Sequence, residues 1–92
     1  MTGGDPMAAL RLRFRARLAD ERVLLRDAAE AGDAAALRAV CHRIAGAGGM
    51  FGYAELSALA SRVEEEIDAG AEGPALAAST ARLTSLIDEV LA

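Results

Sequence analysis

His42 is the single histidine of this 92-residue chain, and it lies in a segment of mostly small and apolar side chains. If residues 34 to about 51 are helical, one apolar stripe is made by Leu37, Val40, Cys41, Ile44, Ala47, Gly48 and Phe51. At about 100° per residue, His42 points about 140° away from Leu37, so we expect its imidazole to face solvent. Neutral imidazole offers an unprotonated ring nitrogen near neutral pH, which makes His42 a candidate nucleophile.

The neighbours of His42 on the expected helix leave the ring open. The residues within two helical turns of His42, either on the same helix face or adjacent in sequence, are Arg38, Ala39, Arg43, Ala45, Gly46 and Gly49. A glycine inside a helix lowers its stability by about 1 kcal/mol relative to alanine. The presence of Gly46, Gly48 and Gly49 within four residues therefore indicates a packing or functional reason. We expect Gly48 to allow close helix contact, and Gly46 and Gly49 to let a partner protein approach His42.

Other reactive groups give weaker patterns. Cys41 and His42 are consecutive and lie about 100° apart on a helix, so they do not form a metal-ligand or nucleophile pair, and a buried thiol is expected. The acidic run of residues 64–66 with Asp68 is interpreted as a solvated helix face. The glycines of residues 46–52 lack the preceding strand and the lysine of a phosphate-binding loop. No metal site is predicted.

The composition predicts one all-α domain. Alanine, leucine and arginine are the commonest residues, glutamate is frequent, and the two prolines are Pro6 and Pro74. A chain of this length has little room for a self-contained ATP-binding kinase. The net charge of −4 argues against a general nucleic-acid binder, and the six arginines of residues 11–26 are interspersed with acidic residues, as on a solvated face.

No membrane span or secretory signal is visible, so a cytoplasmic protein is expected. The single cysteine excludes an intramolecular disulfide and fits a reducing compartment.

Helix-breaking residues divide the chain into four amphipathic segments. Residues 1–5 are expected to form a disordered lead, with Asp5 as cap and Pro6 at the first position of a helix that runs to about Ala31. Its apolar side comprises Met7, Leu10, Phe14, Leu18, Leu25 and Ala28. The charges of residues 19–22 predict either a kink or a break into two helices, and we prefer one long, kinked helix.

The remaining boundaries follow from glycine, aspartate and proline. Gly32 and Asp33 end the first helix and cap the second, Gly52 ends the second, and residues 70–73 form a loop before Pro74 starts the last. The inner faces of the third and fourth helices are Leu56, Leu59, Ala60, Val63 and Ile67, then Leu76, Thr80, Leu83, Ile87 and Val90. Residues 6–92 are therefore predicted to form an antiparallel up-down-up-down four-helix bundle.

The stretch from His42 to Gly52 resembles the histidine phosphotransfer (HPt) domains of bacterial two-component phosphorelays. Ile44, Gly46, Phe51 and Gly52 match the apolar and glycine positions of the family motif, and the resemblance extends over nearly the whole chain. Ala45 departs from the motif, because the family usually has lysine or arginine there, a residue thought to favour the phosphoryl group. By direction, Arg38 is a better substitute than Arg43, which points about 100° away from His42.

The resemblance implies a phosphotransfer intermediate rather than a kinase acting on ATP. His42 would carry a phosphoryl group to or from the aspartate of a response-regulator receiver domain, with Mg²⁺ supplied by that partner and no cofactor bound by this chain. A hybrid histidine kinase is a further expected partner, and a monomer without nucleic-acid or membrane binding is expected. Docking is expected at Arg38, Ala39, Arg43, Ala45, Gly46 and Gly49.

A second interpretation stays open. The chain would then be a non-catalytic helical adaptor that binds a signalling protein through the glycine-rich face around His42 or through the arginine-bearing first helix. A His42→Gln variant separates the two, because only the phosphotransfer interpretation predicts loss of function with folding and binding retained.

Overall fold

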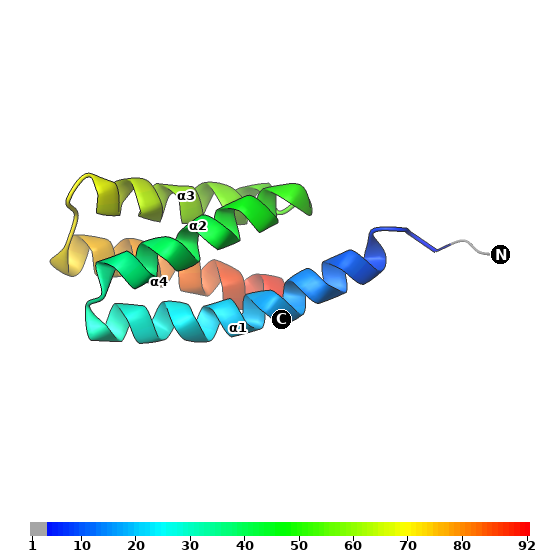
Figure 1. The fold of residues 1–92 in the computed structure, drawn as a ribbon, viewed down its shortest axis with the longest axis horizontal. Helices are drawn as coiled ribbons and strands as arrows, with labels where there is room; N and C mark the ends of the chain where they lie inside the picture. Colours follow the sequence, from blue (N-terminus) through cyan, green and yellow to red (C-terminus); the bar gives the residue numbers. More distant parts are fainter. Residues whose placement is uncertain (1–3) are drawn as a thin grey trace.

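The computed structural model describes residues 4–92, and these residues form four helices (Figure 1). The helices are α1 (Ala8–Ala31), α2 (Ala34–Met50), α3 (Ala54–Asp68) and α4 (Gly73–Leu91). Within the described part of the chain, each helix packs against the next and α4 packs against α1. The predicted antiparallel up-down-up-down bundle is confirmed. None of these helices is long and apolar enough to cross a membrane.

The start of α1 differs from the expectation. The α-helix begins at Ala8 rather than at Pro6, because residues 5–8 form a tighter turn in which the Asp5 carbonyl accepts the Ala8 N–H at 3.0 Å. Asp5 still caps this turn, since its carboxylate accepts the Met7 N–H at 2.8 Å. Asp5 also pairs with Arg11. The first three residues of the expected disordered lead lie outside the described residues.

α1 is a single helix through the charged residues 19–22, so it is not split there. Two of these charges bind neighbouring helices instead of disturbing α1. Glu21 accepts hydrogen bonds from Arg43 of α2, and Arg22 donates to Asp88 of α4 at 2.8 Å.

The predicted turns are confirmed. Gly32 adopts a left-handed φ of 65° and ends α1, and Asp33 caps α2 by accepting the Ala36 N–H at 3.0 Å. Gly52, with φ of 87°, ends α2. The last loop is shorter than expected, because α4 already begins at Gly73, with Pro74 in its first turn.

The core lies along the shared axis of the four helices. The buried hydrophobic residues are Phe14, Leu18, Leu25, Ala28, Leu37, Val40, Cys41, Ile44, Leu56, Ala60, Val63, Leu83 and Ile87. The prediction that Leu10 lies on the buried side of α1 was wrong, since Leu10 is 40% exposed. The beginning of α1 projects beyond the ends of the other helices, so they do not cover it (Figure 1). Phe14 contacts Phe51 and Tyr53, with ring centroids 5.6 and 5.1 Å apart, and so ties α1 to the turn between α2 and α3.

Candidate functional site

The His42 side chain is 73% exposed, which confirms its expected direction. The buried stripe of α2 sets this direction: Leu37, Val40, Cys41, Ile44 and Gly48 are all buried. Because a helix has about 3.6 residues per turn, burial of this stripe turns residue 42 toward the edge of α2 that borders α3.

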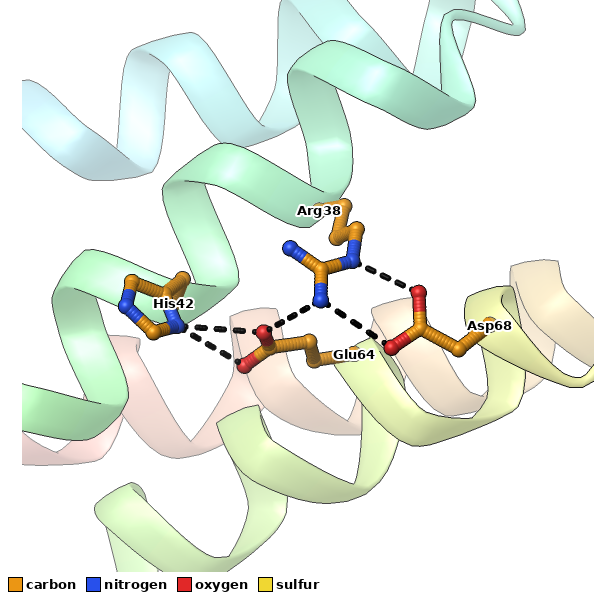
Figure 2. A network of polar contacts seen from close by, with 4 residues as sticks. All are labelled: Arg38, His42, Glu64 and Asp68. Carbon is orange, nitrogen blue, oxygen red and sulfur yellow. Dashed lines mark hydrogen bonds and ion pairs between the residues drawn. The ribbon is translucent and has the colours of Figure 1, made fainter.

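Glu64 of α3 holds one nitrogen of the His42 ring. Nδ1 lies 3.1 Å from Oε2 and 3.3 Å from Oε1 of Glu64, while the other ring nitrogen points away from the carboxylate (Figure 2). An ionised carboxylate only accepts hydrogen bonds, so the contact favours the tautomer with the proton on Nδ1. In that tautomer, Nε2 carries the free lone pair and lies on the solvent side.

The sequence interpretation missed this role of Glu64, since it assigned residues 64–66 to a solvated face. The Glu64 side chain is only 15% exposed. A signal was present: Ser57, Glu64 and Asp68 follow one line of α3 beside its buried stripe, at the helical spacings of seven and four residues. The register between α2 and α3 then decides which α2 residue this line meets.

Arg38 lies one turn before His42 and turns toward the same acidic line. Its Nη2 lies 3.1 Å from Glu64 Oε2 and 3.0 Å from Asp68 Oδ2, and its Nε lies 2.6 Å from Asp68 Oδ1 (Figure 2). The hydrogen bond with Asp68 raises the pKa of Arg38, and the same bond lowers the pKa of Asp68. The four side chains therefore form one polar network across α2 and α3.

The other expected docking residues divide into two groups. Ala39 and Gly46 are exposed, and a Cβ atom added at Gly46 would meet open space. Arg43 lies on the opposite flank of α2, where it donates to Glu21 of α1 at 3.0 Å, as its direction in the sequence predicted.

Ala45 and Gly49 lie on the side of α2 that borders α3, although Gly49 is itself exposed. Ala45 is half-buried against the core, and its carbonyl accepts a hydrogen bond from the Ser57 hydroxyl at 2.6 Å. A Cβ atom at Gly49 would stand 3.3 Å from Ser57 Oγ, so this glycine has a packing reason of its own. Gly48 is buried, and a Cβ there would contact the α3 backbone at 3.5 Å, in line with its expected role in close helix contact.

Met50 was not among the expected docking residues, yet it is 73% exposed. It follows Gly46 by one turn and His42 by two turns, so the three residues share the outer face of α2. An exposed methionine is a flexible apolar contact that adapts to a protein surface. Helical spacing from His42 was the available signal.

Cys41, next to His42 in the chain, is fully buried, as expected, and burial raises the pKa of its thiol to about 12. The described residues contain no group of three or more His, Cys, Asp or Glu side chains that could hold a metal ion. A hollow of about 850 Å³ opens between the end of α1 and the start of α4, and His42 does not line it. His42 therefore lies outside this hollow.

The comparison with protein families agrees with this arrangement. The family model of the Hpt domain matches residues 9–92, which cover all four helices except the first residue of α1. No curated protein and no solved structure matched the chain. The chain belongs to the Hpt domain family, whose members carry out histidine phosphotransfer in phosphorelays.

Proposed function

We propose that His42 is the phosphoryl acceptor and donor of this chain, and that its partners are the receiver domains of response regulators. The observation that carries the proposal is the pairing of an exposed imidazole with a carboxylate on one nitrogen only. In the neutral ring, this pairing favours the tautomer whose lone pair is on Nε2, the exposed nitrogen that a nucleophile must offer.

The transfer step balances without an added reactant. The lone pair of Nε2 attacks the phosphorus of an aspartyl phosphate, the N–P bond forms, and the P–O bond to the aspartate breaks. The aspartate carboxylate leaves with the bonding electrons. The positive charge that develops on the ring is stabilised by Glu64, which keeps the Nδ1 proton at hydrogen-bond distance, and the reverse step returns the phosphoryl group.

Charge on the phosphoryl oxygens is neutralised by the partner in this proposal. Both arginines nearest to His42 in the chain are already paired: Arg38 with Glu64 and Asp68, and Arg43 with Glu21. Ala45 supplies no cation. We therefore assign charge neutralisation to the Mg²⁺ that a receiver domain carries, and the chain itself binds no cofactor in this scheme.

The docking face we propose is the outer side of α2, made by Ala39, His42, Gly46 and Met50. Small side chains on both sides of His42 let the rim of a concave active site reach Nε2. Arg38, Arg43, Ala45 and Gly49 border this face. A single copy of the chain presents all of these residues, so we propose that it acts as a monomer, with a hybrid histidine kinase as a further partner.

The same pairing of the arginines favours one alternative function. With both Arg38 and Arg43 paired to carboxylates, the described part of the chain fits a helical adaptor that binds a signalling protein through the α2 face and performs no chemistry.

The deciding experiment incubates the protein with Mg²⁺ and receiver domains charged by acetyl phosphate or by a kinase. Intact mass follows an acid-labile, base-stable phosphoryl group on this chain. We expect the group on the native protein and not on His42→Gln, with the variant still helical by circular dichroism. Binding of receiver domains without any phosphoryl transfer, across a broad panel, would establish the adaptor instead.

A further inference from the structure

Glu64 is shared by two donors that compete for it. Its Oε2 lies 3.1 Å from His42 Nδ1 and 3.1 Å from Arg38 Nη2 (Figure 2). A guanidinium prefers to bind a carboxylate through two parallel N–H groups. Arg38 on its own would therefore take both oxygens of Glu64 and leave the His42 ring without its partner.

Asp68 prevents this competition in the structure. It occupies the two-donor edge of Arg38, with Nε at 2.6 Å from Oδ1 and Nη2 at 3.0 Å from Oδ2. Arg38 keeps only an ion-pair contact with Glu64, at 3.1 Å from Nη2 to Oε2, and the Glu64 carboxylate keeps both oxygens within 3.3 Å of His42 Nδ1. Since Asp68 follows Glu64 by one turn of α3, helix geometry alone keeps the two carboxylates side by side.

We propose that Asp68 is a positioning residue for His42, which acts by holding Arg38 so that Glu64 stays on Nδ1. The consequence for phosphoryl transfer rests on the proposed function of His42, whereas the consequence for the ring tautomer does not. Asp68 lies beyond reach of the phosphoryl group in this scheme and works only through Arg38 and Glu64.

The test compares Asp68→Asn with Asp88→Asn. Asp88 is a matched control, because it is an exposed carboxylate that binds Arg22 at 2.8 Å between α1 and α4, and it takes no part in the network of His42. Long-range ¹H–¹⁵N spectra of the imidazole give the ratio of the two ring tautomers in the absence of any partner. We expect Asp68→Asn to lower the ratio of the Nδ1–H to the Nε2–H form about tenfold, the scale of one lost charge-assisted hydrogen bond.

A second pair of variants tests the route through Arg38. In an Arg38→Gln background, the additional change Asp68→Asn is expected to leave the tautomer ratio unchanged, because the competitor for Glu64 has already been removed. The phosphorylation rate of Asp68→Asn is expected to fall in proportion to its Nδ1–H population, with the helix content retained.

Each outcome bears on one proposal. An unchanged tautomer ratio in Asp68→Asn overturns the inference, as does an equal shift in Asp88→Asn or an undiminished shift in the Arg38→Gln background. A native protein that is never phosphorylated overturns the function of His42 but leaves the tautomer test valid. A tautomer shift with an unchanged phosphorylation rate in a phosphorylated protein would show that the Asp68 contact does not serve the transfer.

Discussion

Gly49 and Ser57 pack so closely that a side chain at position 49 would require the Ser57 hydroxyl to shift by a few tenths of an ångström. A Cβ atom there would lie 3.3 Å from Ser57 Oγ, and this hydroxyl holds the Ala45 carbonyl at 2.6 Å. Gly46, one turn earlier on the same helix, has open space around it. The glycines beside His42 therefore serve different purposes: Gly49 allows α2 and α3 to approach, whereas nothing in the bundle requires glycine at position 46.

This difference predicts opposite effects of alanine on stability. Gly46→Ala is expected to raise the free energy of unfolding by about 1 kcal/mol, since alanine is the better helix former and the added methyl meets no atom. Gly49→Ala gains the same helix propensity but must push the Ser57 hydroxyl aside, so its net change should be smaller or destabilising. Urea denaturation measures both variants, and equal stabilisation would contradict the packing role of Gly49.

A bulky residue at position 46 should separate folding from transfer. Gly46→Gln is expected to fold at least as stably as the native protein and to slow phosphoryl transfer from a charged receiver domain at least about tenfold, because it obstructs the approach to His42. Ala58→Gln, on an exposed position of α3, is the control. Transfer at the native rate in Gly46→Gln would place the docking face elsewhere.

Glu64→Gln should weaken His42 as a nucleophile without unfolding the bundle. The amide removes the negative charge beside Nδ1, so the Nδ1–H tautomer loses its preferred partner and the charge on the ring is no longer balanced. We expect transfer to slow at least about tenfold, the scale of a lost hydrogen bond to a charged group. Glu65→Gln changes the charge equally at an exposed position of α3 and should retain the native rate.

The elements of the fold could be predicted because their signals are local. Gly32 with Asp33, Gly52 and Pro74 define the boundaries of the helices through backbone conformation and capping, which depend on neighbouring residues only. Leu10 shows the limit of such reasoning. It continues the apolar stripe of α1, yet no other helix extends far enough to cover it.

The site was predictable only as far as one helix determines it. The apolar period of α2 gave the direction of His42, but the contact with Glu64 depends on how far α3 slides along α2, which no pattern within either helix encodes. Arg38 illustrates the same limit. Its direction toward the His42 side was correct, while its capture by Asp68 required the position of α3.

Ala45→Lys tests whether the missing basic residue limits this chain. Residue 45 is half-buried beside Ser57, and a lysine there can extend its apolar stem along the helix surface and bring its ammonium group to solvent near His42. We expect a longer half-life of the phosphohistidine and a faster transfer, because the added charge attracts the phosphoryl oxygens. Ala45→Met, of similar length and without charge, should leave both unchanged, and equal gains in the two variants would exclude an electrostatic cause.

Cys41 should remain unreactive in the native protein although it is adjacent to the exposed His42. Burial raises the pKa of its thiol to about 12, so the reactive thiolate is scarce at pH 8, and a thiol reagent should label the protein only after unfolding in urea.

The raised pKa of Cys41 also makes the free energy of unfolding depend on pH. In the unfolded chain the thiol loses its proton at a lower pH than in the native protein. The protonated, buried thiol therefore contributes fully to the free energy of unfolding below about pH 8.5. Above that pH the contribution falls, by at most about 1.4 kcal/mol per pH unit, until the pH reaches the pKa of the native thiol. Cys41→Ala lacks this titration, so the difference in unfolding free energy between native protein and variant should shrink between pH 8 and 10.5; a constant difference, or rapid labelling without urea, would contradict a sealed thiol.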